Sequence, residues 1–342
     1  TKGFQGGDGG GLAIEIATDR GGDADPADRQ PGQPDQHQKA ADPVDKGLDA
    51  GGGIAAVGPA HALVAEGGFG LVFEGLQVGV GGEEGSRLSA AYIERLLDDP
   101  NSGVVEPAAM ILEVVQGEGG VIPAAKSWLQ EIRRMTDERG IPLIVDEVQT
   151  GLGRTGKLFA FEHADIVPDV VVLSKAIGGG LPLSVVVYRP ELDQWTAGAH
   201  AGTFRGNQLA MATGLATMEF ITAERIDEHA ARMGERLLAC LRQIQGEARS
   251  LGDVRGRGLM IGVEIVDRDA PIELPGCHPS APRLASRIQH EALRRGLILE
   301  LGGRHNCVVR FLPPLIVTAE QIDTIATIFS EAVKAAEEQG VA

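Results

Sequence analysis

The sequence predicts an α/β protein with a mostly parallel sheet covered by helices, plus a smaller C-terminal α+β domain. Two observations favour this fold class. From about residue 88, short apolar runs that can form buried strands alternate with stretches of helical periodicity, which is typical of parallel sheets covered on both faces. From residue 252 the pattern changes to strand, helix, strand and helix. The length of 342 residues allows one large or two ordinary domains.

The elements of the expected large domain, residues 87–222, follow from hydrophobic spacing. Trp128, Leu129, Ile132 and Met135 recur at helical intervals, whereas AAMILEVV at 108–115 is a continuous apolar run that suits a buried strand. The expected helices are residues 90–97, 124–139 and 208–222. The expected strands are residues 108–115, 141–145, 169–173 and 183–188.

The expected small domain covers residues 223–342. Its last helix begins at Ala319, because Thr318 and Gln321 form a capping box, in which each side chain satisfies a backbone N–H of the other. The other expected helices are residues 224–249 and 283–295. The expected strands are residues 259–266 and 308–311.

The first 86 residues differ in composition from the rest of the chain. They hold 14 acidic and five basic residues, and their net charge of −9 is more than half of the −17 of the whole chain. Residues 21–50 show neither helical nor strand periodicity. We therefore expect residues 1–86 to be an atypical, poorly ordered segment. A stretch rich in Gly, Ala, Asp, Pro and Gln is also what an out-of-frame reading of a GC-rich gene produces. Translation of the gene in all six frames would test this hypothesis.

Composition and charge exclude several classes of function. A net charge of −17 and a pI near 4.9 give a surface that repels nucleic-acid backbones, so we expect no nucleic-acid partner. Cys240, Cys277 and Cys307 are scattered, which argues against disulfides or a structural zinc site and favours a reducing compartment. No stretch resembles a membrane span or an export signal. We expect a cytoplasmic protein without a membrane partner.

Two glycine motifs resemble nucleotide-binding loops but lack essential parts. Gly151, Gly153 and Gly156 form G-x-G-x-x-G after a strand, yet no helix start follows. Residues 151–157 also match G-x-x-x-x-G-K, but Leu158 stands where a magnesium-binding hydroxyl is needed. A nicotinamide oxidoreductase therefore remains a minor alternative. The histidines and cysteines lack ligand spacing, so no metal is expected.

One lysine and one aspartate follow buried strands and point to a cofactor aldehyde. Lys175 closes the strand at 169–173, and Asp146 closes the strand at 141–145. Ligands bind at the carboxyl ends of strands in open α/β sheets, where a desolvated lysine amine can form a Schiff base. If the aldehyde is pyridoxal phosphate, Asp146 can keep the pyridine nitrogen protonated and so make the ring an electron sink. A surface lysine and a structural ion pair are the alternative interpretations.

Four ordered segments then give a family resemblance over residues 90–342. They are EVVQGEGG at 113–120, VDEVQTG at 145–151, SKAIGGG at 174–180 and GTFRGN at 202–207. This part of the chain resembles class III (ω-amino acid) aminotransferases, which are pyridoxal-phosphate enzymes of fold type I. The stretches 198–210 and 297–305 are most similar to diaminobutyrate–2-oxoglutarate aminotransferases.

The resemblance implies a role for each matching residue. Lys175 is the catalytic lysine that binds pyridoxal phosphate and moves the proton; Asp146 pairs with the pyridinium, and Gln149 lies near the ring hydroxyl. Thr203 reaches the cofactor phosphate of the neighbouring subunit, which implies a homodimer with shared active sites. Glu118 and Arg310 bind substrate as a switch: they pair when an ω-amine enters and separate when the arginine holds the α-carboxylate of glutamate or 2-oxoglutarate. An ordinary structural ion pair is the alternative for these two.

The implied reaction transfers the 4-amino group between L-2,4-diaminobutyrate and the 2-oxoglutarate/glutamate pair, so the partners are a small amino donor and a 2-oxo acid. Alternatives within the family are enzymes for ornithine, 4-aminobutyrate or an acylated diamine, or an aminomutase. Residues 1–86 contain no phosphate-binding loop of the family kind. A non-catalytic remnant is therefore the alternative from another class.

Overall fold

The computed structural model describes residues 13–17, 61–65, 68–72, 82–199, 201–272 and 278–339. The first three stretches form strands β1 (Ala13–Ala17), β2 (His61–Ala65) and β3 (Gly68–Val72). They lie within the segment expected to be poorly ordered, and that expectation stays a prediction, because the rest of residues 1–81 lies outside the described residues. Helix α1 (Gly82–Asp98) begins before residue 86 and crosses the boundary expected there.

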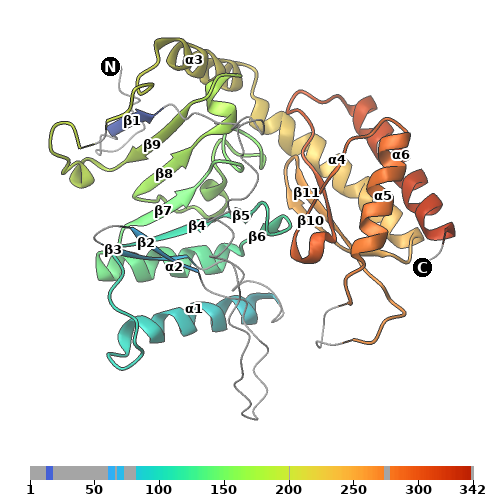
Figure 1. The fold of residues 1–342 in the computed structure, drawn as a ribbon, viewed down its shortest axis with the longest axis horizontal. Helices are drawn as coiled ribbons and strands as arrows, with labels where there is room; N and C mark the ends of the chain where they lie inside the picture. The colour runs from blue at the N-terminus through green and yellow to red at the C-terminus, as the bar shows by residue number, and fades with distance from the viewer. Residues whose placement is uncertain are drawn as a thin grey trace, which may run out of the picture.

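A seven-stranded sheet forms the larger part of the molecule (Figure 1), with the strand order β1-β9-β8-β7-β4-β3-β2. Its four central strands, β8, β7, β4 and β3, run parallel, whereas β1, β9 and β2 join it antiparallel. The strands predicted from buried apolar runs are β4 (Ala109–Glu113), β7 (Leu143–Asp146), β8 (Val170–Leu173) and β9 (Ser184–Tyr188).

Strand β9 is antiparallel because its connection to β8 is short. Only residues 174–183 separate the two strands, and they contain one short 3₁₀ helix, η4 (Lys175–Gly178). A parallel return needs a crossover of a dozen or more residues. The sheet is therefore mixed, with a parallel centre, and is less uniformly parallel than the sequence predicts.

Helices α1 and α2 (Lys126–Arg139) pack beside the sheet on one side of the view in Figure 1, and α3 (Gln208–Ala223) lies at the other end. The predicted apolar spacing in α2 is confirmed, because Trp128, Leu129, Ile132 and Met135 are all buried against this part of the core. The remaining short elements are β5 (Val115–Gln116), β6 (Ile122–Pro123), η3 (Ala160–Ala164) and η5 (Pro190–Leu192).

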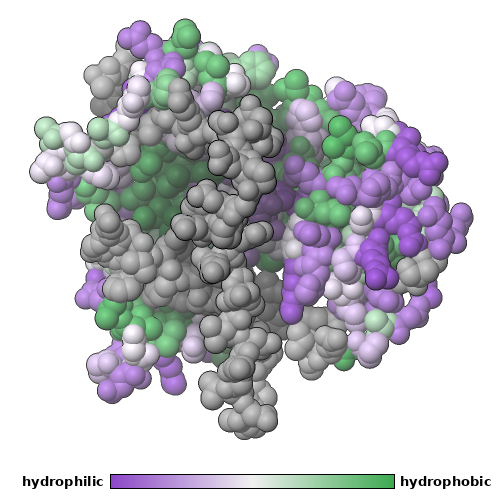
Figure 2. Space-filling view, in the orientation of Figure 1, coloured by the Kyte–Doolittle hydropathy of each residue, from purple (hydrophilic) through white to green (hydrophobic). Residues whose placement is uncertain are grey.

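The C-terminal part has an antiparallel four-stranded sheet in the order β10-β11-β13-β12, with helices packed on it. Its outer face is largely hydrophilic in Figure 2. The capping box of Thr318 and Gln321 is confirmed at the start of α6. The strands are β10 (Leu251–Arg257), β11 (Met260–Ile265), β12 (Glu300–Gly302) and β13 (Val308–Phe311). The helices are α4 (Ile226–Glu247), α5 (Pro282–Arg294), η6 (Arg304–Asn306) and α6 (Ala319–Glu338).

Interlocking apolar side chains hold the C-terminal helices on their sheet. Leu237 and Leu241 of α4 are fully buried in one cluster with Ile261 and Val263 of β11. Phe329 of α6 meets the ring of Phe311 edge to face at 5.1 Å. Burying each large apolar side chain contributes about 2 kcal/mol. Among the described residues, no helix combines the length and hydropathy needed to cross a bilayer.

Candidate functional site

The carboxyl edge of the parallel strands brings together the lysine and aspartate singled out in the sequence. Asp146 is the last residue of β7 and lies opposite Val172 of β8, and Lys175 begins η4 two residues after β8 ends. The Asp146 Oδ1 atom accepts a hydrogen bond of 2.8 Å from the backbone N–H of Val148. This bond fixes the carboxylate at the start of the turn that carries Gln149.

The backbone of Lys175 adopts a conformation that is uncommon for a residue with a side chain. Its φ is 51°, in the left-handed region, at the start of η4. Surrounding contacts hold the loop in place: Ser174 Oγ lies 2.9 Å from Ser184 Oγ, and Thr213 of α3 donates a 2.7 Å hydrogen bond to the carbonyl of Gly178. Such backbone outliers cluster at functional sites. The exposed Lys175 side chain is thus carried on a well-fixed loop.

A cleft of about 580 Å³ separates this sheet edge from the C-terminal sheet. Lys175, Gln149 and Val148 line it from the sheet edge, and Arg310 and Glu300 line it from β13 and β12. Asp146 and Glu118 are not among its lining residues, although each lies beside one that is. The cleft therefore has an amine on one wall and a guanidinium on the other, and two carboxylates contact the guanidinium.

Arg310 is held between two carboxylates. Its side chain is only 2% exposed, and Nη1 lies 2.7 Å from Glu118 Oε2, while Nη2 lies 3.5 Å from Glu300 Oε2. The hydrogen bond from Arg310 lowers the pKa of Glu118 below its usual range, although desolvation opposes the shift. Glu118 is therefore ionised at neutral pH. The predicted proximity of Glu118 and Arg310 is confirmed, whereas their role in substrate binding is untested.

Gln149 links the two sides of the cleft through weak hydrogen bonds. Its Nε2 donates to Glu118 at 3.4 Å, and its Oε1 accepts from Arg310 at 3.4 Å. Two glycines leave room for this cluster: a Cβ on Gly117 would lie 1.9 Å from the Gln149 Oε1 atom, and a Cβ on Gly302 would lie 2.7 Å from the Arg310 Cδ atom. The side chains of Gln149 and Arg310 thus lie directly against backbone.

Glu147 is a buried acid that the sequence reasoning did not select. It is 1% exposed, accepts a 2.5 Å hydrogen bond from Thr150 Oγ1 and accepts one of 3.0 Å from the backbone N–H of Phe161. Burial raises the pKa of Glu147 to about 7. Its position next to Asp146 was the available signal, but only the fold shows that one of the two carboxyls turns inward.

Glu300 was also missed, and no local pattern could have found it. It becomes a neighbour of Arg310 only because β12 and β13 pair antiparallel, with Glu300 directly opposite Arg310. Residues opposite each other in such a pair project from the same face of the sheet. The contact depends on strand register, which the linear sequence does not display.

Thr203 lies apart from this cluster. It is exposed in the turn that precedes α3 and does not line the cleft of its own chain. In that region Asn207 caps α3, with its Oδ1 accepting from the backbone N–H groups of Leu209 and Ala210. The structure of one chain therefore does not bring Thr203 together with Lys175.

The glycine motif at residues 151–156 has a packing role. It lies in a series of turns with no helix start, and Gly156 approaches α4 so closely that a Cβ would be 3.0 Å from the Cβ of Ala231. Within the described part of the chain, no group of three or more His, Cys, Asp or Glu side chains could hold a metal ion.

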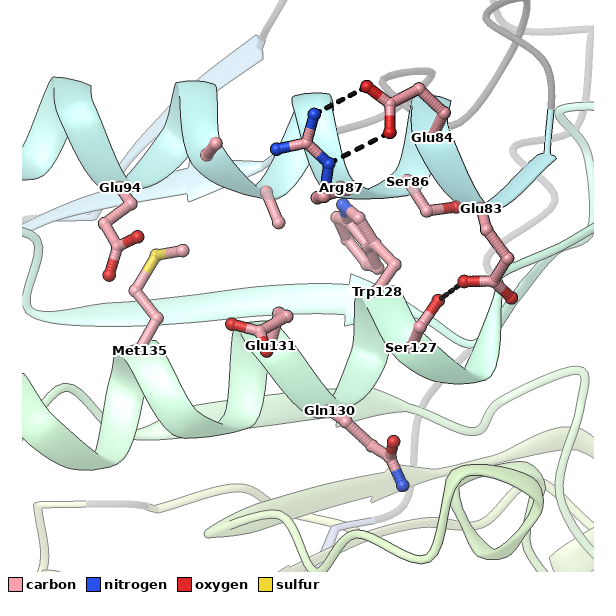
Figure 3. A pocket seen from close by; sticks show the side chains of 12 residues that line it. Glu83, Glu84, Ser86, Arg87, Glu94, Ser127, Trp128, Gln130, Glu131 and Met135 are labelled. Atoms are coloured by element: carbon pink, nitrogen blue, oxygen red, sulfur yellow. Dashed lines mark hydrogen bonds and ion pairs between the residues drawn. The ribbon is translucent and has the colours of Figure 1, made fainter.

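A second hollow of about 510 Å³ lies between α1 and α2, and Figure 3 shows the polar and apolar side chains that line it. Its charged side chains all have partners, and Glu94 and Glu131 pair with Arg134 outside the hollow. Arg87 pairs with Glu84 at 2.5 Å, and Ser127 donates to Glu83. None of the residues selected from the sequence lies there, and we assign it no function.

Comparison with known proteins identifies the family. The profile of the family described as aminotransferase class-III matches residues 82–333. A diaminobutyrate–2-oxoglutarate aminotransferase of Rhizobium meliloti is 57% identical over 248 residues, covering 72% of this chain and 53% of the relative. One of Haemophilus influenzae is 46% identical over 255 residues, covering 75% and 56%. The chain thus spans about half the length of the curated relatives it matches.

Solved structures with the same fold agree with this match. A transaminase from the marine bacterium Virgibacillus superposes with a TM-score of 0.66 at 28% identity, covering 74% of this chain and 58% of that one. The ornithine aminotransferase of Toxoplasma gondii, described with partial occupancy of PLP at its active site, gives a TM-score of 0.64 at 32% identity, covering 73% and 55%. Profile, relatives and fold agree, and the chain belongs to the class-III aminotransferase family.

Proposed function

We propose that this protein is a pyridoxal-phosphate aminotransferase that moves the 4-amino group between L-2,4-diaminobutyrate and the 2-oxoglutarate/glutamate pair. The observation that carries the proposal is the placement of Lys175 and the Arg310–Glu118 pair around one cleft. The identity of 57% to a relative named for this reaction supports the choice of substrate.

The donor set fits the ring and aldehyde end of the cofactor. Lys175 offers a primary amine for the aldehyde, and Asp146 offers a carboxylate on the neighbouring strand end for the pyridine nitrogen. When bound, pyridoxal phosphate supplies an electron sink for the carbanion that forms as the substrate loses a proton. Asp146 maintains that sink by keeping the ring nitrogen protonated, and Gln149 orients the ring hydroxyl.

Lys175 has two tasks in this proposal. Its Nζ atom would hold the cofactor aldehyde, and as a free amine it would be the base that takes the proton from the substrate carbon and the acid that returns it. The fixed backbone of the Lys175 loop limits the positions that Nζ can reach. Proton transfer between two fixed points requires such restraint.

Arg310 and Glu118 allow one site to accept two substrates. With an ω-amine bound, the two remain paired at the 2.7 Å distance of the present structure. For glutamate or 2-oxoglutarate, Glu118 moves aside and the guanidinium binds the α-carboxylate in a bidentate manner. The exposed Glu118 side chain can move into water at little cost, whereas the buried Arg310 stays in place.

Both arginines among the described residues that line the cleft are already engaged with other groups. Among the described residues of the cleft, the guanidinium of Arg154 donates to the carbonyls of Leu259 and Pro313, and Arg310 is paired with Glu118. We propose that Thr203 of a second copy contacts the phosphate in a homodimer. Exposed apolar side chains on α3, at the top of Figure 2, support such an interface. They are Leu209, Met211, Leu215 and Phe220.

Mixing two variants tests the shared site. Lys175→Ala and Thr203→Ala chains are each expected to have low activity, but a mixed dimer contains one site in which both residues are intact. Recovery of activity on mixing, with a dimer seen by analytical ultracentrifugation, supports the proposal. A monomeric chain, or no recovery from a mixed dimer, contradicts it.

The visible absorption spectrum tests the cofactor and the reaction together. Purified protein mixed with pyridoxal phosphate should show an absorption band that L-2,4-diaminobutyrate bleaches, and Lys175→Ala should lack it. Absence of the band from folded wild-type protein would contradict the proposal and favour a non-catalytic remnant. Parallel assays with ornithine and 4-aminobutyrate would identify a different amine within the family.

We also propose that the enzyme lies in the cytoplasm. Residues 87–222 would form its cofactor-binding domain, and residues 223–342 would form its small domain. The acidic composition and the three scattered cysteines support that location and argue against a nucleic-acid partner. Fractionation of cells that express the protein would test the location.

A further inference from the structure

Glu300 occupies a position in the cleft that the proposed reaction does not use. It lies opposite Arg310 in the β12–β13 pair, lines the same cleft as Lys175, and keeps 64% of its side chain exposed. Its contact with Arg310, at 3.5 Å, is the only ion pair of Glu300 within the described residues, and its carboxylate accepts no hydrogen bond from them. Glu300 is therefore a carboxylate with unused acceptor capacity.

Arg310 cannot neutralise both of its acidic neighbours. Glu118 takes the short contact at 2.7 Å together with a hydrogen bond from Gln149, whereas Glu300 stays at 3.5 Å on the other side of the guanidinium. Glu300 thus shares the guanidinium with Glu118, on which the charge of Lys175 also acts. The weakly compensated carboxylate of Glu300 favours a ligand that brings a positive charge to this wall of the cleft.

We propose that Glu300 is a specificity-determining residue that binds the non-reacting ammonium group of a diamino acid. The inference rests on the proposed transamination, because it assigns the second amino group of the substrate whose first amino group reacts at Lys175. A primary ammonium has three N–H donors, and Glu300 offers acceptors that no other described group uses. Amines that lack this second ammonium leave Glu300 with only its 3.5 Å contact to Arg310.

Two amines that differ in one group provide the test. L-2,4-diaminobutyrate and 4-aminobutyrate share the carbon chain, the carboxylate and the reacting amine, and only the first carries an α-ammonium. In Glu300→Gln, kcat/KM is expected to fall ~10- to 100-fold for diaminobutyrate, the loss expected for one charge-assisted hydrogen bond. The value for 4-aminobutyrate should change less than about 3-fold, because that amine has no group for Glu300 to bind.

Two further variants separate recognition from structure. Glu300→Asp keeps the charge and should retain part of the preference for diaminobutyrate. Glu331→Gln is a matched control: Glu331 has a similar arginine contact, 3.7 Å from Arg295, and similar exposure, 60%, but lies outside the cleft. Glu331→Gln should leave kcat/KM unchanged for both amines. Equal losses for both amines in Glu300→Gln, or no change for either, would overturn the proposal.

Binding without turnover distinguishes this inference from the proposed function. Calorimetric titration of the Lys175→Ala chain with each amine should show tighter binding of diaminobutyrate, and the added Glu300→Gln substitution should remove the difference. The wild-type chain could form the cofactor band while the Lys175→Ala chain binds both amines equally. That result would overturn the ammonium site and leave the proposed function standing. Lack of the band overturns the cofactor chemistry, and the titration still decides the role of Glu300.

Discussion

The two walls of the cleft are built differently. The sheet wall carries Lys175, exposed on a loop with a left-handed backbone, beside Asp146 at the end of β7. The opposite wall carries Arg310, buried in β13 and set between Glu118 and Glu300. The first wall presents an amine and a carboxylate, and the second presents a guanidinium and two carboxylates. In the proposed function, reaction and recognition therefore come from different walls of the cleft.

The largest expected effect is on the sheet wall. Lys175→Ala should lower the transamination rate by about 10³-fold or more, because both cofactor attachment and proton transfer depend on its amine. Stopped assays with diaminobutyrate and 2-oxoglutarate would measure the loss. Lys157→Ala, at an exposed lysine outside the cleft, should keep the wild-type rate. If the Lys175→Ala chain were as active as the Lys157→Ala control, Lys175 and the sheet wall would take no part in the reaction.

The buried acid behind the sheet wall should make stability depend on pH. Burial raises the pKa of Glu147 from its ordinary value of 4.5 to about 7, so between these pH values the folded state binds more protons than the unfolded state. Stability therefore falls as pH rises through this window, by about 3 kcal/mol, and this contribution is constant above pH ~7. Urea unfolding from about pH 4.5 to 8 would measure the trend.

Glu147→Gln should remove this part of the pH dependence, while its one amide oxygen can still accept from the backbone N–H of Phe161 and its NH₂ group can donate to Thr150 Oγ1. Glu331→Gln, at an exposed acid, should follow the wild-type profile. An unchanged slope in Glu147→Gln would show that the decline has another origin.

A smaller effect is expected on the recognition wall. Arg310→Lys keeps the charge but loses the planar guanidinium. The kcat/KM for 2-oxoglutarate should therefore fall ~100-fold, a larger loss than that in kcat/KM for diaminobutyrate. Stability should change less than on loss of the charge, because lysine keeps a positive charge at this buried position beside both carboxylates. Arg236→Lys alters a comparable pair with Asp323, 2.8 Å and 2.7 Å long, on α4 and α6. Equal effects of the two substitutions would contradict a binding role for Arg310.

The smallest expected effect concerns the close contact between Gly302 and the Arg310 side chain. Gly302→Ala would place a Cβ 2.7 Å from the Arg310 Cδ atom, so the guanidinium must shift and KM for 2-oxoglutarate should rise about 10-fold. Gly246→Ala, where an added Cβ meets nothing within 4 Å, is the matched control and should leave KM unchanged. If Gly302→Ala also has no effect, the position of Arg310 does not depend on this close approach.

Strand and helix positions beyond residue 88 could largely be predicted because burial imposes a period on the sequence. Apolar runs gave β4, β7, β8 and β9, and the capping box located the start of α6. Strands β10 and β12 were missed. Strand β10 includes Gly252 and Gly256 together with charged residues, and β12 has only three residues, so neither shows a clear alternation.

The sequence alone determined the residue types and spacings of the site: Lys175 and Asp146 follow buried strands, and Glu118 and Arg310 lie in segments that resemble the family. Tertiary structure decided which of these groups meet. Strand register placed Glu300 opposite Arg310, and the short β8–β9 connection made β9 antiparallel. Burial of the Glu147 side chain gave it surroundings different from those of its neighbour Asp146. These features depend on contacts between residues distant in the chain, which hydrophobic period and local motifs do not encode.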